Sequence, residues 1–244
     1  SVSLANREPE RNNYTDNGNY PYPKKEQVTD YELGYQYTGS NWHAGANFYY
    51  MAYDNQIAQT GQTSDIGEAL TTNIKDSYRM GVELTAGWAP LSWLSVEGNA
   101  ALSQNKIKDF DEYLGDHVNH YDKSTLAYSP SAILNGFLDF HYQGFNATWH
   151  TNFVSKQYVD NSESSERQLP SFSQTDINMS YTINLKGCGL KSVKLGLDLN
   201  NIFDRHYAVM GYDWGWYEGD TRKSYLGYVP AAGFTMMGNI TLRF

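Results

Sequence analysis

The chain has 244 residues, of which 15% are aromatic and only 18% are charged, and its formal net charge is −9. An acidic chain with no basic stripe cannot neutralise phosphates well, which excludes nucleic acid as a partner. No apolar run approaches the length of about 18 residues that a transmembrane helix needs, and the single cysteine, Cys188, cannot form an internal disulfide.

Apolar side chains recur at every second residue in one segment after another, and this period predicts β-strands with one apolar and one polar face. Residues 1–5 have the pattern of the last part of a strand, so we expect the chain to begin inside a larger folded unit. Nine further strands are expected at residues 28–37, 42–52, 78–88, 94–102, 132–142, 145–153, 177–185, 193–199 and 234–244. Most of these segments have about the 9–11 residues that a tilted transmembrane β-strand needs.

The connections between these segments alternate between short and long. Short ones fall at residues 39–41, 89–92, 143–144 and 186–190, and long polar ones fall at residues 7–26, 54–77, 106–129, 157–171 and 205–228. Outer-membrane barrels combine tight periplasmic turns with long extracellular loops, whereas a soluble sandwich has no reason to sort its loops in this way. The sequence therefore predicts an all-β, antiparallel transmembrane barrel whose chain end lies on the periplasmic side.

Aromatic residues gather beside the short turns. In a barrel they would form the girdle at the membrane interface, and packing between neighbouring strands is the alternative. They are Tyr37, Trp42, Trp88, Trp93, Tyr142, Phe145 and Phe244.

The closing segment has an apolar face that includes Phe234, Ile240, Leu242 and Phe244. Lipid would cover this face, and a neighbouring strand would have to cover its edge. Because the opening segment is only a stub, we expect the missing wall to come from residues before Ser1 or from another chain. Acidic residues on the polar faces are expected to line the lumen, namely Glu32, Glu83, Glu97, Asp139, Asp176 and Asp198.

Three stretches carry a family resemblance: Ser3-Leu-Ala-Asn-Arg-Glu-Pro-Glu-Arg-Asn-Asn-Tyr14, Leu199-Asn-Asn-Ile-Phe-Asp-Arg-His-Tyr207, and Tyr228-Val-Pro-Ala-Ala-Gly-Phe234 leading into the final strand. In this order they resemble the C-terminal half of TonB-dependent outer-membrane receptors. The resemblance implies a 22-stranded barrel filled by a plug domain. Residues 1–244 would then be one incomplete domain with about the last ten strands and without the plug. It also implies that the barrel-assembly machinery reads the final strand.

The same resemblance implies a function. These receptors capture a scarce nutrient and import it with energy from TonB, which would act through the absent plug. The three stretches most resemble those of Bacteroidetes receptors for iron complexes. Residues 228–233 favour that branch of the family over the glycan importers that pair with a surface lipoprotein. We therefore expect a receptor for a ferric siderophore or a similar iron complex, with no enzymatic activity and no cofactor.

Four alternatives stay open at this point. An importer of the same family could take a glycan, a peptide or cobalamin, and a barrel of the same class could be a passive channel. A ten-stranded outer-membrane protease would need a complete first strand. A soluble β-rich binding domain would not need a membrane.

The long connection at residues 205–228 has the composition of a ligand-binding loop. Aromatic rings beside cations suit an aromatic, anionic ligand such as a ferric catecholate, through stacking and charge. The alternative is a hydrophobic cluster that orders the loop. The candidate residues are Tyr212, Trp214, Trp216, Tyr217, Arg222, Lys223 and Tyr225.

The acidic connection at residues 109–122 contains two histidines, His117 and His120, among carboxylates. These residue types can bind a metal, but their spacing lacks the closed pattern of a structural zinc site. Solvated loop acids are the simpler interpretation, and we predict no metal site.

Overall fold

The computed structural model describes residues 1–15, 20–64, 67–185 and 189–244. Most of its strands form one antiparallel sheet, in the order β1, β2, β3, β4, β5, β7, β8, β11, β12, β15. Their bounds are β1 Val2–Arg7, β2 Glu26–Thr38, β3 Trp42–Thr63, β4 Ala69–Leu91, β5 Leu94–Leu114, β7 Ala132–Tyr142, β8 Phe145–Val154, β11 Phe172–Asn184, β12 Ser192–Asn200 and β15 Thr235–Arg243. Cys188 and most of the turn predicted around it lie outside the described residues.

The remaining elements are short or paired locally. The strand β6 (His117–Thr125) pairs with the far end of β5, β9 (Gln157–Tyr158) pairs with β10 (Gln168–Leu169), and β13 (Ala208–Glu218) pairs with β14 (Thr221–Pro230). The one helix in the described ranges is α1 (Arg11–Thr15).

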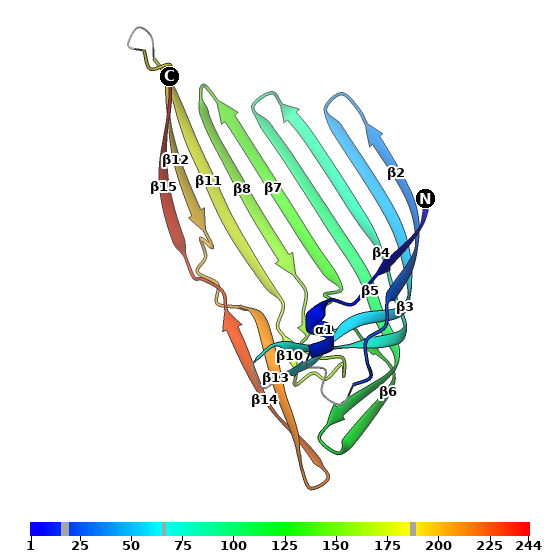
Figure 1. Cartoon of the computed structure of the whole chain (residues 1–244). Helices are drawn as coiled ribbons and strands as arrows, with labels where there is room; N and C mark the ends of the chain where they lie inside the picture. Colours follow the sequence, from blue (N-terminus) through cyan, green and yellow to red (C-terminus); the bar gives the residue numbers. More distant parts are fainter. Residues whose placement is uncertain (16–19, 65–66, 186–188) are drawn as a thin grey trace.

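The main sheet is a curved wall with β1 and β15 at its two edges (Figure 1). The short turns and the last residue lie at one end of the wall, at the top of the view. At the other end, β6 and the β13–β14 hairpin project beyond it. This arrangement confirms the predicted sorting of the connections, because adjacent antiparallel strands place alternate connections at opposite ends.

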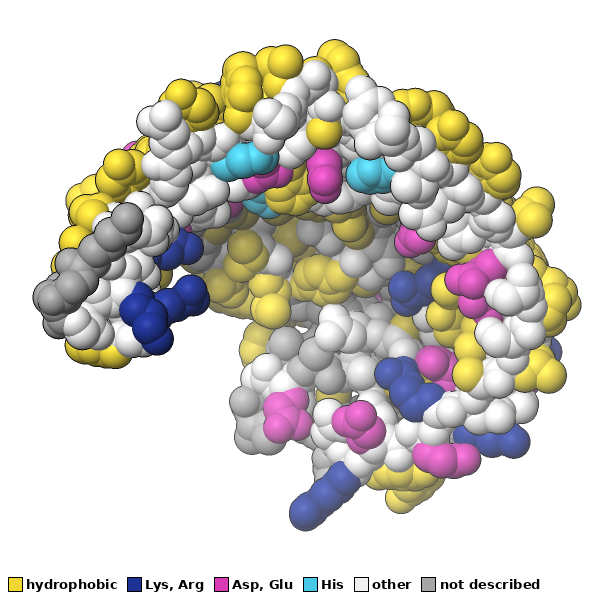
Figure 2. Space-filling view, turned by 90° about the horizontal axis from the view of Figure 1, so that it is seen from above, with side chains coloured by type: hydrophobic (Ala, Val, Ile, Leu, Met, Phe, Trp, Pro, Cys, Tyr) yellow, Lys and Arg dark blue, Asp and Glu magenta, His cyan; other side chains and the backbone are white. Residues whose placement is uncertain are grey.

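The two faces of the wall differ as the period-two pattern predicts. Cross-strand pairing sets Leu33 opposite Phe48, Phe48 opposite Val82, and Val82 opposite Leu102, so these apolar side chains form a row on one face. Leu33 is 74% exposed and Phe48 56% exposed. Seen from the end with the short turns, hydrophobic side chains cover the outer surface of the arc, and acidic and histidine side chains lie on its inner surface (Figure 2).

Polar side chains on the inner face bond across the strands. Asp139 accepts a hydrogen bond from Thr148, Asp176 lies 3.8 Å from the ring of His150, and Asp198 accepts one from Asn239. These residues belong to strands β7, β8, β11, β12 and β15. The polar faces of neighbouring strands therefore meet on the inner side of the wall, where Asp139, Asp176 and Asp198 lie.

Aromatic residues beside the short turns lie at the surface and also pack on one another. Trp88 and Tyr142 are more than half exposed. The rings of Tyr37 and Trp42 stack with centroids 4.5 Å apart, and those of Trp93 and Phe140 meet edge to face at 5.4 Å. The interface girdle and cross-strand packing are therefore both compatible with their positions.

The buried core lies at the end opposite the short turns. Ala58, Ile74, Ile107, Phe110 and Leu126 form a buried cluster from β3, β4, β5 and the segment after β6. Elsewhere the wall is one sheet thick, so its apolar outer face has no protein against it. The only packed core in the described residues is therefore beneath the projecting segments.

A strand lies at each of the ten predicted segments, but the expectation of long loops between them is wrong in detail. The strands β3, β4 and β5 run on far beyond their predicted ends, and residues 205–228 contain the β13–β14 hairpin. Extra-membrane segments of a barrel can continue its strands because backbone pairing does not require lipid. Within the described ranges, no helix is long and apolar enough to cross a membrane, a finding that concerns helices alone.

Candidate ligand-binding site

The β13–β14 hairpin sorts the candidate loop residues onto two faces. Trp214 pairs with Tyr225, and Trp216 pairs with Lys223. Directly opposed residues share a face of an antiparallel pair, and residues two apart along a strand do so as well. One exposed face, called the aromatic face below, therefore carries Tyr212, Trp214, Trp216, Lys223 and Tyr225.

Close packing holds Tyr212 in place on this face. A Cβ atom added at Gly227, its partner across the hairpin, would lie 2.1 Å from the Tyr212 ring. Only glycine leaves room for the ring to lie across the opposite strand. The position of Tyr212 thus depends on a residue that the ligand-loop interpretation did not include.

Tyr217 and Arg222 lie on the opposite, buried face. The Arg222 Nη2 atom donates to Glu112 Oε1 at 2.7 Å and to Asp213 Oδ2 at 2.8 Å. Two carboxylates therefore already neutralise Arg222, and its contact with a ligand stays a prediction. Among the predicted cations of this loop, Lys223 alone lies on the aromatic face.

Arg222 belongs to a buried charge cluster made of Glu112, Asp160, Arg167, Asp213 and Arg222. Three carboxylates face two guanidinium groups, so one negative charge is in excess. Burial raises the pKa of Asp213, although the hydrogen bond from Arg222 opposes this shift. Burial also lowers the pKa of Arg222, but Glu112 and Asp213 more than offset that effect and leave it above its ordinary value.

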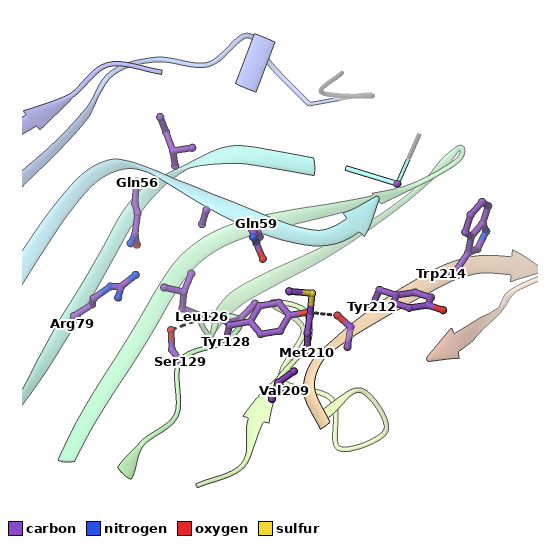
Figure 3. Close-up of a pocket in the computed structure, with 15 residues that line it drawn as sticks. Gln56, Gln59, Arg79, Leu126, Tyr128, Ser129, Val209, Met210, Tyr212 and Trp214 are labelled. Atoms are coloured by element: carbon purple, nitrogen blue, oxygen red, sulfur yellow. Dashed lines mark hydrogen bonds between the residues drawn. The ribbon is translucent and has the colours of Figure 1, made fainter. Parts of the chain in front are cut away.

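A cavity of about 880 Å³ lies between β13, the extended part of β3, β4 and the segment after β6 (Figure 3). Tyr212 and Trp214 bring the aromatic face to its edge. Tyr128 reaches from the opposite side, and its hydroxyl donates to the carbonyl of Gly211. The other polar or flexible side chains that Figure 3 labels around the cavity are Gln56, Gln59, Arg79, Ser129 and Met210.

Arg79 is the cation that lines this cavity. Its guanidinium lies 5.7 Å from the centroid of the Tyr53 ring, and its buried Nε atom has no hydrogen-bond partner. No carboxylate of the described residues lies within 4.0 Å of its nitrogens to form an ion pair. An aromatic-edged cavity with an unneutralised guanidinium suits an anionic ligand with flat or apolar groups.

Arg79 was missed because strand residues were interpreted only as barrel wall, and Gln56 and Gln59 were missed because residues 54–77 were interpreted as a polar loop. The alternation did place Arg79 on the inward face, since it lies between the outward-facing Tyr78 and Met80. A lone arginine on the inward face near the long-loop end was the available signal. The depth and the lining of the cavity depend on contacts between segments far apart in the chain.

His117 and His120 are not brought together. They are three residues apart on β6 and so point to opposite faces of the strand. The His117 ring stacks on Tyr217 with centroids 4.0 Å apart, whereas His120 Nδ1 lies 2.8 Å from Asp111. Across the described ranges, no group of three or more His, Cys, Asp or Glu side chains is arranged to hold a metal ion.

The surroundings of His120 predict a shifted titration. Its hydrogen bond with Asp111 raises its pKa above the ordinary value of 6.5, with further contributions from Asp122 and Asp109. The protonated form is thus favoured in the folded hairpin. Its stabilising effect is fully present below pH 6.5 and is lost as the pH rises through the raised value.

We expect Asp111→Asn to lower the pKa of His120 toward its ordinary value. Histidine-labelled receptor, observed by NMR over a pH series, measures this pKa, and His120→Gln assigns the resonance. Asp116→Asn, which removes a carboxylate outside the His120 ion pairs, is the matched control. A pKa that is the same with and without Asp111 would contradict the assignment.

Comparison with known proteins agrees with this architecture. The family described as TonB dependent receptor-like, beta-barrel matches residues 1–202. The pesticin receptor of Yersinia enterocolitica is 25% identical over 191 residues, which are 77% of this chain and 26% of that receptor. The chain thus spans about a quarter of the length of this curated relative.

Solved structures share the fold at lower identity. The copper transporter OprC superimposes with a TM-score of 0.69 at 19% identity, over 98% of this chain and 36% of OprC. The ferric yersiniabactin uptake receptor FyuA from Yersinia pestis gives 0.64 at 16% identity, over 98% of this chain and 33% of FyuA. The ferric-catecholate import receptor Fiu from K12 E. coli gives 0.65 at 14% identity, over 99% of this chain and 32% of Fiu. With a family match over residues 1–202, this chain belongs to the TonB-dependent receptor-like β-barrel family.

Proposed function

We propose that this chain is part of an outer-membrane receptor that captures an iron complex and imports it with energy from TonB. Three solved structures that share its fold support transport of such ligands rather than an enzymatic reaction: the ferric yersiniabactin uptake receptor, the ferric-catecholate import receptor and the ferric citrate transporter FecA. The single observation in the chain itself that carries the proposal is the cavity, which is edged by the aromatic face and lined by Arg79.

The chemistry of this site favours a ferric catecholate or a similarly flat, anionic complex. Tyr212 and Trp214 offer ring faces for stacking, and Arg79 offers a guanidinium that no carboxylate neutralises. Lys223 on the aromatic face adds a second positive charge at the rim. A complex with aromatic chelating groups and a net negative charge would match both features.

The remaining parts of the proposal concern the whole receptor. Residues 1–244 would be about the last ten strands of a 22-stranded barrel in the Bacteroidetes style, with the outer face of the wall in contact with lipid. The plug, absent from these residues, would connect to TonB. The barrel-assembly machinery would recognise the final strand, and a surface lipoprotein is a further candidate partner.

Uptake by cells tests the function. Cells that lack the receptor would be complemented with the full-length gene and supplied with a radiolabelled ferric catecholate, ferric citrate or cobalamin. We expect accumulation of the catecholate complex that requires TonB. Uptake that is unchanged without TonB would identify a passive channel, and uptake of cobalamin in place of the ferric complexes would replace the ligand class.

Trp214 and Trp216 allow a finer test of the aromatic face. Trp214 lines the cavity and Trp216 does not, although both are exposed on the same strand. We expect Trp214→Ala to weaken binding of a ferric catecholate by roughly fivefold, since loss of aromatic stacking costs about 1 kcal/mol. Trp216→Ala should have a smaller effect.

Binding to the purified, correctly assembled full-length receptor measures both effects, and the double variant should bind least well. Equal affinity of the double variant and the natural protein would show that the aromatic face only orders the loop.

A further inference from the structure

The buried charge cluster joins segments that lie far apart in the chain. Glu112 comes from β5, Asp160 and Arg167 from the segment between β9 and β10, Asp213 from β13 and Arg222 from β14. The Arg167 Nε atom lies 2.5 Å from Asp160 and 3.8 Å from Asp213, and Arg222 Nη2 lies 3.5 Å from Asp160. The cluster is therefore continuous through all four elements.

Neutral hydrogen bonds extend the cluster to β6. Tyr217 donates to Asn119 Oδ1 at 2.6 Å, and Asn119 Nδ2 in turn donates to Glu112 at 2.9 Å. Tyr121 donates to the same carboxylate at 3.2 Å. Glu112 thus receives hydrogen bonds from both its own hairpin and the β13–β14 hairpin.

A second link ties the segment between β9 and β10 to the cavity wall. Asn161 Nδ2 donates to the carbonyl of Gln59 at 2.8 Å, and its Oδ1 accepts from the backbone amide of Ala127 at 2.7 Å. Gln59 and Ala127 both line the cavity. The cluster and the cavity are therefore parts of one packed assembly.

Burial makes this assembly cooperative. Glu112 and Asp160 are each 2% exposed, and Asp213 is 4% exposed. If one segment moved away alone, it would leave an unpaired charge in the remaining interior, which is strongly unfavourable. The favourable states are the one with all segments joined and the one with all segments separated and hydrated.

We propose that the charge cluster locks the β5–β6 hairpin, residues 157–169 and the β13–β14 hairpin into one unit, with Arg222 as the residue that positions the aromatic face over the cavity. The lock itself does not depend on which ligand the receptor binds. Its consequence for ligand capture rests on the proposed function.

The geometry of Arg222 supplies a conservative variant. A single atom, Nη2, donates to both Glu112 and Asp213, while Nε and Nη1 have no partner in the described residues. A lysine ammonium carries three donors on one nitrogen, so it can serve both carboxylates. Arg222→Lys should therefore keep the lock, and Arg222→Met should break it.

Hydrogen exchange of the full-length, ligand-free receptor tests the lock. We expect Arg222→Met to accelerate amide exchange roughly tenfold or more, and to do so together in residues 108–121, 157–169 and 208–228. Arg222→Lys should exchange like the natural protein. Lys223→Met is the matched control, because it removes one positive charge from the next position on the exposed face of the same strand.

Three results would overturn the proposal: acceleration confined to the β13–β14 hairpin, equal acceleration in Lys223→Met, or Arg222→Lys exchanging as fast as Arg222→Met. Unchanged exchange in β7 and β8 verifies assembly of the barrel wall. If Arg222→Met does not assemble, Glu112→Gln weakens the same ion pair from the β5 side and must accelerate the same three segments.

Ligand binding by the same variants separates this proposal from the function. Concerted exchange in a receptor that takes up no ferric complex would leave the lock standing and reject the ligand class. Uptake of a ferric complex by a receptor whose three segments do not exchange together would reject the lock and leave the proposed function standing.

Discussion

Replacing Ile240 by arginine is expected to lower the stability of the folded barrel by about 2–4 kcal/mol, the cost of an arginine on a lipid-facing strand near the middle of the membrane. Ile240 is 70% exposed, pairs with Leu195 and lies on the outer, apolar face of β15. In lipid its side chain has hydrocarbon around it, and a guanidinium there loses its hydration. Urea titration of the purified full-length receptor, followed by the gel mobility of the folded form, measures this loss.

Asn239→Arg is the matched control for this experiment. Asn239 is the neighbouring residue on β15, but it faces inward and its amide lies 3.4 Å from Asp198. An arginine there meets water and a carboxylate, so we expect almost no loss of stability. Equal losses of stability in both variants would show that the two faces of β15 are not in contact with different solvents.

Arg79→Met is expected to weaken binding of a ferric catecholate by about thirtyfold, which corresponds to about 2 kcal/mol. The guanidinium of Arg79 lines the cavity and forms no ion pair with a carboxylate of the described residues, so its positive charge would attract an anionic ligand bound there. Methionine keeps most of the apolar length of the side chain and removes the charge. Titration of the purified full-length receptor with the ferric complex measures the affinity.

Lys108→Met controls for the general loss of positive charge. Lys108 lies on the neighbouring strand β5, pairs with Asp76 at 2.9 Å on the surface and does not line the cavity. We expect unchanged affinity, because an exposed pair contributes little and is screened by salt. Equal weakening by both variants would mean that overall charge, and not the cavity, attracts the ligand.

The barrel wall was predictable because it depends on a local property. A strand with lipid on one side and water on the other must alternate, and a shift of one residue would turn every side chain to the wrong solvent. The row of apolar side chains from Leu33 to Leu102 shows that four neighbouring strands keep their apolar residues on the same face. The lengths of the extra-membrane strands were not predictable, since both their faces are polar or covered by other segments.

The candidate site was predictable only in part. The composition of residues 205–228 identified the aromatic loop, and Tyr212 and Trp214 do reach the cavity. The same composition could not show that Trp216 and Arg222 lie on opposite faces, because this requires the register of the hairpin. It also gave no reason to connect the loop with Arg79.

The amino-acid sequence by itself determined where the ten strands of the wall lie, which of their faces is apolar and at which end the long connections lie. These properties follow from interactions between neighbours in the chain and from the solvent on either side of each strand. Only the tertiary structure decided that Arg222 is neutralised while Arg79 is not. One partner of Arg222 is Glu112, 110 residues away, and the other is Asp213 on the facing strand of the hairpin. Whether a charged side chain is free for a ligand therefore depends on which segments fold against it.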